Sequence, residues 1–267
     1  MVVSGAAPDV MRGTGESPAA TGTAFPVVPG GRCAGEGDVV QDVARLAGRL
    51  AAVPLGGLAR RRRGKPMHPR GVVLDAVLER TGVMQGWGVR WLEEPAREPA
   101  VVRLSRGAGL PAPLPDLLGL AVRLPDGDRP VDLLLSTAGS GRWTRFLPVP
   151  RVDAAATYSS FMGYRSPAGT LRLAAVPDGP GGVQSDPGPV AEAVAERGLA
   201  FRLLVARGAG DWVPFARLTL TAPVAELDPD LRFDAVRNPP PGLLADGPLA
   251  RFRAPAYAAA REGRASA

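Results

Sequence analysis

The chain is poor in the residues that build metal and disulfide sites. Its 267 residues contain one cysteine, Cys33, and one histidine, His68. A single cysteine excludes an internal disulfide framework, and with a single histidine it argues against zinc or two-metal hydrolase sites, which usually need several such ligands. A magnesium site built only from carboxylates stays open.

Long apolar runs and a recognisable leader are also missing. No stretch approaches the roughly 18–20 uninterrupted apolar residues of a membrane-spanning helix. The N-terminus, MVVSGAAPDVMRG, lacks the charged start and apolar run of a secretory signal. Hydrophobic residues make up 45% of the chain and charged residues 22%, which is the composition of a protein that buries a core. We therefore expect a soluble, cytoplasmic protein without a membrane span.

The positive charge reflects arginine, and aromatic residues are scarce. The net charge is +6, from 32 basic and 26 acidic residues, yet Lys65 is the only lysine and isoleucine is absent. This bias is typical of a GC-rich bacterial genome. Aromatic residues make up 5% of the chain, and none interleaves with the basic run at 60–63 as a stacking platform for nucleic acid requires. The sequence thus predicts a solvated basic surface and no nucleic-acid partner.

Composition and periodicity divide the chain into a tail and one domain. Residues 1–36 are rich in Gly, Ala, Pro, Ser and Thr without periodicity, which predicts a disordered N-terminal tail. Residues 37–267 are expected to form a single domain. Within it, apolar residues spaced by three and four predict a helix over 38–53 that begins at Asp38.

After His68 the pattern becomes that of strands separated by Pro, Gly and Asp. Asp126-Gly127-Asp128 predicts a hairpin, and helices are expected over 153–163 and 189–197. The predicted strands are 72–79, 87–92, 99–105, 118–124, 131–136, 170–176, 199–206 and 212–221.

Eight sequential strands joined by short turns favour closure, because a closed sheet leaves no exposed edge. The predicted fold class is therefore mainly β (α+β): a closed antiparallel eight-stranded barrel with a few flanking helices. The Pro-rich C-terminal segment is expected to wrap around the barrel as an arm.

Familiar catalytic motifs are absent. The sequence has no GxxxxGK[ST] loop, no GxGxxG after a strand and no GxSxG nucleophile elbow. Taken alone, His68 reads as a residue of a surface loop.

Two segments change the interpretation of His68. His68-Pro69-Arg70-Gly71 leads into a strand, and Val102-Arg103-Leu104-Ser105 lies on a later one. Together they resemble the heme-dependent catalase superfamily, in which a His-x-basic-Gly segment carries the histidine on the peroxide side of the heme. An Arg-Phe-Ser strand follows in that family; its serine hydrogen-bonds the histidine and its arginine reaches a heme propionate. In this chain Leu104 replaces the phenylalanine.

The resemblance implies heme b as cofactor and assigns roles to individual residues. His68 and Ser105 are the implied catalytic residues. Arg103 and Lys65 are the implied partners of heme propionates, since the family carries a basic residue three positions before its histidine.

The neighbouring strands extend the resemblance. Residues 115–124 look like the family's Asp-x-x-Gly-x-Ala-Val-Lys strand, and 131–134 look like its following Asp-Leu strand. The family's asparagine beside the histidine has no counterpart in the stretch 135–139. A hydroxyl of Ser136 or Thr137 would have to orient the peroxide there.

At the C-terminus, Arg253, Tyr257 and Arg264 reproduce the spacing around the tyrosine that ligates the heme iron in catalases. The resemblance therefore implies Tyr257 as the iron ligand, Arg253 as the cation that stabilises its phenolate, and Arg264 as a propionate partner. The simpler interpretation is a tyrosine that packs its ring at the end of the arm.

The function implied is that of a heme-binding, catalase-like oxidoreductase that acts on a peroxide or an organic (fatty-acid) hydroperoxide. Two alternatives remain open. One is a degenerate catalase-like barrel without heme that acts as a binding or interaction protein. The other is an unrelated hydrolase such as a phosphodiesterase, for which the sequence offers no residue set. In each case the chain could form a homo-oligomer.

Overall fold

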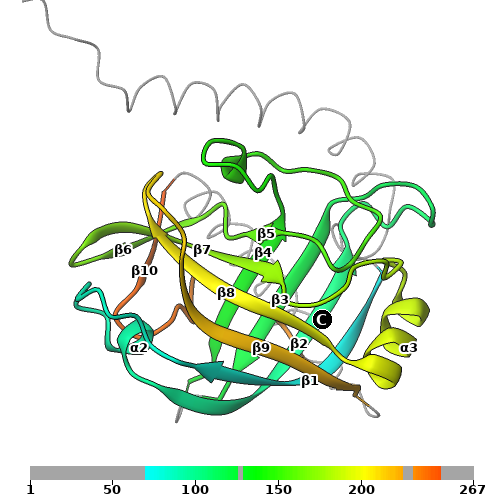
Figure 1. The fold of residues 1–267 in the computed structure, drawn as a ribbon, viewed down its shortest axis with the longest axis horizontal. Helices are drawn as coiled ribbons and strands as arrows, with labels where there is room; N and C mark the ends of the chain where they lie inside the picture. The colour runs from blue at the N-terminus through cyan, green and yellow to red at the C-terminus, as the bar shows by residue number, and fades with distance from the viewer. Residues whose placement is uncertain (1–69, 126–128, 225–230, 248–267) are drawn as a thin grey trace, which may run out of the picture.

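The computed structural model describes residues 70–125, 129–224 and 231–247 (Figure 1). The predicted tail over 1–36 and helix over 38–53 lie outside the described residues. So do Lys65, His68, Arg253, Tyr257 and Arg264.

Eight antiparallel strands close into a barrel, as the sequence predicted. Each pairs with the next around the ring, and the β7–β8 pairing completes the closure. In ring order they are β1 (Arg70–Arg80), β2 (Ala96–Arg106), β3 (Leu118–Leu124), β4 (Val131–Thr137), β5 (Tyr158–Ser159), β7 (Gly169–Pro177), β8 (Leu199–Arg207) and β9 (Val213–Pro223). Two short strands, β6 (Gly163–Ser166) and β10 (Leu244–Asp246), extend the sheet beside β7.

The barrel interior is packed with apolar side chains. Successive residues of a strand point to opposite faces, so every second residue turns inward. The inward residues of the ring belong to one buried cluster, which includes Leu74, Val102, Leu120, Leu133, Leu173, Phe201 and Leu218. The inside of the barrel is therefore a core, and a ligand site has to lie on its outer surface or rims.

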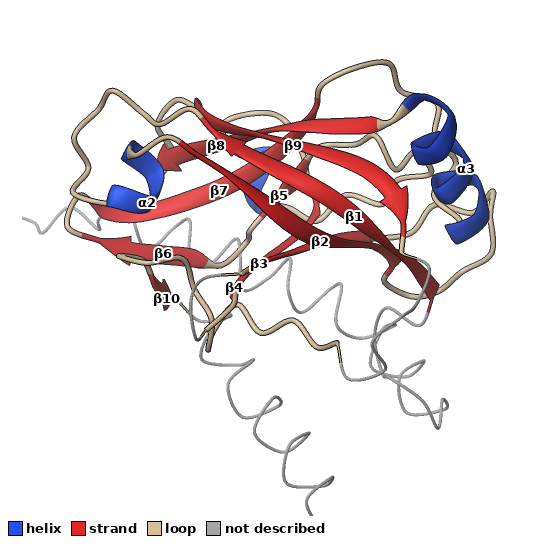
Figure 2. Ribbon diagram, turned by 90° about the horizontal axis from the view of Figure 1, so that it is seen from below, coloured by secondary structure: helices blue, strands red, loops and turns tan. Residues whose placement is uncertain are grey.

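Three short helical segments flank the barrel. The predicted helix at 189–197 is confirmed as α3 (Pro187–Arg197), which packs beside β1 and β9 through Val190, Ala193 and Val194 (Figure 2). The others are α2 (Arg90–Glu93) and the 3₁₀ turn η1 (Thr144–Phe146). No helix among the described residues is long and apolar enough to cross a membrane.

The prediction of a strand over 87–92 is wrong. Residues 90–93 form α2, which buries Trp91 and Leu92. The Glu93 carboxylate accepts hydrogen bonds from the backbone N–H groups of Trp87, at 2.5 Å, and Val89, at 3.3 Å. This side chain holds the segment in a turn, so the alternation of Trp87, Val89 and Trp91 does not mark a strand.

The prediction of a helix over 153–163 is also wrong. Instead of capping a helix, the Asp153 carboxylate accepts hydrogen bonds from the backbone N–H groups of Ala155, Gly182 and Val183. The segment then runs extended as β5 between β4 and β7. The eighth strand of the ring is therefore β5 and not 87–92.

The described part of the C-terminal segment lies against the barrel, in agreement with the predicted arm. Buried Asp132 on β4 accepts hydrogen bonds from the Asn238 side chain and the Asp234 backbone N–H, both at 2.8 Å. The Arg123 guanidinium binds the same carboxylate at 2.8 Å and lies 5.3 Å from the Phe233 ring centroid.

Candidate functional site

A row of small residues crosses the outer surface of the barrel. The cross-strand registers place one residue from each of six strands side by side. On its own strand, each of these residues alternates with inward-facing core residues. The row consists of Gly71, Ser105, Gly119, Ser136, Ser159 and Ala174. Glycine within a strand marks places where another group approaches the backbone closely. The side chains of this small-residue row therefore protrude little from the strands that carry them.

Arg103 lies beside the small-residue row, two residues before Ser105 on β2. A Cβ on Gly71 would lie 2.7 Å from the Leu104 carbonyl oxygen, 2.8 Å from Ser105 Cβ and 2.9 Å from Arg103 Nη2. Only glycine leaves room for the arginine side chain over the start of β1. Burial lowers the pKa of Arg103, because its cation is partly removed from water. A partly desolvated guanidinium is a favourable partner for a carboxylate.

Hydroxyl groups line the same row. Ser105 is buried and Ser159 is 1% exposed. Among the described residues the Ser159 Oγ has no hydrogen-bond partner, and Ser159 pairs directly with Ser136 across β4 and β5. Buried hydroxyls are nearly always satisfied, so an unsatisfied one calls for an explanation. Sequence analysis missed Ser159 because it placed the residue in a helix.

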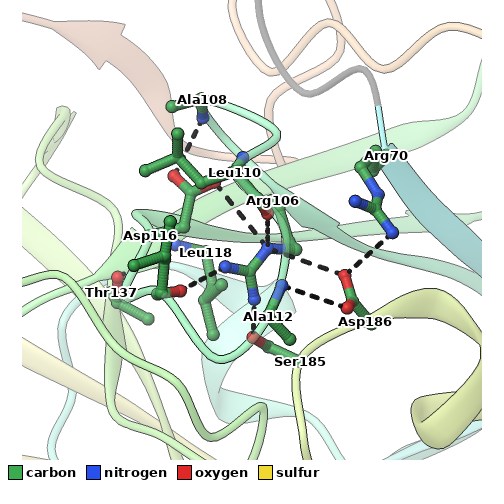
Figure 3. Close-up of polar contacts among 11 residues, drawn as sticks. Arg70, Arg106, Ala108, Leu110, Ala112, Asp116, Leu118, Thr137, Ser185 and Asp186 are labelled. Atoms are coloured by element: carbon green, nitrogen blue, oxygen red, sulfur yellow. Dashed lines mark hydrogen bonds and ion pairs between the residues drawn. The ribbon is translucent and has the colours of Figure 1, made fainter.

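A polar cluster around buried Arg106 fixes the start of β1, the strand that follows His68-Pro69 in the sequence. Arg70 Nη2 lies 3.3 Å from Asp186 Oδ1, and the Nε atom of Arg106 lies 3.8 Å from the same oxygen (Figure 3). Because Asp186 immediately precedes α3, it ties that helix to β1 and β2. The entry of the chain into β1 is thereby held beside Ser105.

Arg106 holds the loop between β2 and β3. It is 1% exposed and donates to the Leu110 carbonyl at 2.7 Å, to the Leu114 carbonyl and to Ser185 Oγ. The Asp116 carboxylate, 3.8 Å from Arg106 Nε, accepts the backbone N–H groups of Ala108 at 2.9 Å and Leu110 at 3.0 Å (Figure 3). The Arg106 nitrogens and the Asp116 carboxylate oxygens are thus satisfied by these contacts, so this pair is a scaffold. No sequence motif singled out Arg106.

The structure brings together some of the predicted site residues and leaves others outside its described part. Arg103 and Ser105 lie on the same outward face of β2, next to Gly71. The roles assigned to Lys65, His68, Arg253, Tyr257 and Arg264 stay predictions.

The two described tyrosines belong to the core. Tyr158 and Tyr164 are fully buried, and the Tyr158 hydroxyl donates to the Ala154 carbonyl at 2.8 Å. Burial raises the pKa of Tyr158, so its phenol stays protonated and neutral. The third tyrosine of the sequence, Tyr257, lies outside the described residues. In the described ranges, no three His, Cys, Asp or Glu side chains cluster as metal ligands.

Searches against family models and curated proteins find no match. Solved catalase structures do match the fold. A fungal catalase aligns with a TM-score of 0.54 at 12% identity, over 76% of this chain and 60% of that one. Catalase A from Saccharomyces cerevisiae aligns with a TM-score of 0.54 at 10% identity, over 78% and 62%. A bacterial catalase aligns with a TM-score of 0.54 at 11% identity, over 84% and 60%.

These comparisons show that the chain has a catalase-like fold. The aligned region spans about three fifths of the length of those catalases.

Proposed function

We propose that this chain is a catalase-like heme protein that acts on a peroxide or an organic hydroperoxide. The observation that carries the proposal is the small-residue row with Arg103 beside it. A porphyrin is a flat apolar ring with carboxylate groups on one edge. It needs a surface without protruding side chains and a cation at its border, and the outer face of β1 to β4 offers both.

The residues fit the group that the fold family implies. Gly119 would let the ring approach the backbone, and Arg103, whose guanidinium lies over Gly71, would pair with a propionate at the border of the ring. Tyr257 would bind the iron through its phenolate oxygen, with Arg253 lowering the pKa of its phenol; Lys65 and Arg264 would hold propionates. When bound, heme supplies an iron centre that exchanges electrons with peroxides.

The protein would supply the proton transfer. His68 lies three residues before Gly71, and because a residue spans at most about 3.3–3.6 Å, its Cα is within about 11 Å of the Gly71 Cα. His68 would take a proton from the near oxygen of the peroxide and return it to the far one. Ser105 would orient His68 by a hydrogen bond. The Ser136 hydroxyl would orient the peroxide where catalases carry an asparagine.

Reconstitution with hemin tests the proposal. The purified chain, mixed with hemin and desalted, should keep a Soret band. Tyr257→Phe should abolish the high-spin ferric spectrum, whereas Tyr164→Phe, a change at a core tyrosine, should leave it unchanged. His68→Ala should retain heme and lose peroxide turnover.

A folded chain without a Soret band would refute the proposal and favour the alternative, a barrel that binds a partner without heme. An unchanged spectrum in Tyr257→Phe would refute the assignment of the iron ligand.

A further inference from the structure

In the part of the chain that the structure describes, two arginines on the outside of the barrel are held away from water without a carboxylate partner. Arg145, on η1, is 4% exposed; its Nη1 donates to the Gly210 carbonyl at 2.8 Å, and no described residue accepts from its buried Nε. Arg172, on β7, is half-buried and donates to the Phe161 carbonyl at 2.7 Å. Within the described ranges neither forms an ion pair. Arginine is almost never fully buried unless it is paired.

Aromatic rings fix the orientation of both guanidinium groups. The Arg145 guanidinium carbon lies 4.2 Å from the Trp212 ring centroid, and that of Arg172 lies 4.5 Å from the Phe146 ring centroid. Stacking on a ring occupies a face of the guanidinium and leaves its N–H groups pointing sideways. This edge is the one that binds carboxylate and phosphate groups with two parallel hydrogen bonds. On Arg145, the Gly210 carbonyl accepts from Nη1, and no described residue accepts from the buried Nε.

The charges nearby are mostly of the same sign. Burial and then repulsion from Arg142 lower the pKa of Arg145, while Asp211 raises it. Burial and then repulsion from Arg145 lower the pKa of Arg172. Among the groups that act on these two arginines, Asp211 is the one carboxylate, and it acts on Arg145. An added anion would relieve this repulsion.

We propose that Arg145 and Arg172 form an oxyanion site that binds the carboxylate or phosphate group of a small ligand. The site lies between the 139–147 loop, β7 and the turn that joins β8 to β9. Trp143 is 60% exposed beside Arg142 and offers a ring against which an apolar ligand body can pack. The site uses neither Arg103 nor the small-residue row, so it does not depend on heme binding.

Thermal unfolding of the full chain tests the site. Chloride is replaced by inorganic phosphate in one series and by octanoate in another, at constant ionic strength. A ligand that binds only the folded state raises the melting temperature with its concentration, and this dependence gives a dissociation constant. At least one of the two anions should stabilise the protein beyond chloride. Stronger stabilisation by octanoate identifies an amphipathic carboxylate as the ligand class, and stronger stabilisation by phosphate identifies a phosphate group.

Matched variants separate this site from general salt effects. Arg145→Gln should abolish the anion response, and Arg172→Gln should weaken anion binding at least tenfold. Arg202→Gln, at an exposed arginine of neighbouring β8 that lies 3.7 Å from Asp178, should bind as wild type does. If Arg145→Gln does not fold, the anion response of Arg172→Gln decides whether the site exists. Equal stabilisation by both anions and chloride, or equal responses of Arg172→Gln and wild type, would overturn the proposal.

Discussion

Gly71→Ala tests how closely β1 approaches β2 at the small-residue row. The added methyl carbon would lie 2.7 Å from the Leu104 carbonyl oxygen and 2.8 Å from Ser105 Cβ. Both atoms are fixed by the β1–β2 pairing, in which Gly71 is opposite Ser105. Only Arg103 Nη2, at 2.9 Å, belongs to a side chain that can swing away. The strands therefore have to separate, and Arg103 has to leave its position.

The magnitude follows from two opposing effects. Overpacking costs about 1–3 kcal/mol. Replacing glycine reduces the conformational entropy of the unfolded chain and returns about 0.4–1 kcal/mol. The net loss should be about 1–2 kcal/mol in the free energy of unfolding. At about 2–4 °C per kcal/mol for a protein of this size, the melting temperature should fall by about 2–8 °C.

The matched control is Gly86→Ala. Nothing lies within 4 Å of a Cβ at Gly86, so this change should leave the melting temperature unchanged or raise it. Urea unfolding of both variants gives the free energies, and hemin titration of both reports on Arg103. Hemin affinity should fall in Gly71→Ala alone. A Gly71→Ala protein with the stability and hemin affinity of Gly86→Ala would refute the close packing on which the candidate site rests.

Further changes test two buried carboxylates and one core tyrosine. Asp132→Ala should lower the free energy of unfolding by about 3–5 kcal/mol, because it leaves the groups that hold the arm unpaired, and limited proteolysis should then cut within 231–247. Asp116→Ala should lower the free energy of unfolding, measured in urea, by a similar amount. Adding Arg106→Met to that variant should recover part of the loss, and strictly additive effects of the two changes would contradict the pairing of Arg106 with Asp116. Tyr158→Phe should flatten the alkaline loss of stability between about pH 10 and 11.5. The pKa of Tyr158 is raised in the folded state, so the stability that its neutral phenol contributes is complete below the unfolded pKa of about 10 and is lost as the pH rises above it. A variant whose free energy of unfolding falls with pH as steeply as that of the wild type would contradict this.

Local patterns in the sequence determined most of the strands and α3. Alternation with a period of two needs only neighbouring residues, so β1, β2, β3, β4, β7, β8 and β9 could be predicted from the order of the side chains. The same patterns placed Arg103 and Ser105 on one face of one strand.

Tertiary structure decided the remainder, because it depends on contacts between distant residues. The strand β5 has two residues and exists only because β4 and β7 pair with it, while α2 forms where a Glu93 carboxylate folds back on the chain. The small-residue row exists only through five cross-strand registers, which no single segment encodes. The burial of Arg106 and Arg145 likewise depends on loops that meet only in the folded barrel. Sequence periodicity sets which face of a strand is apolar, whereas the pairing of strands sets which residues meet on the other face.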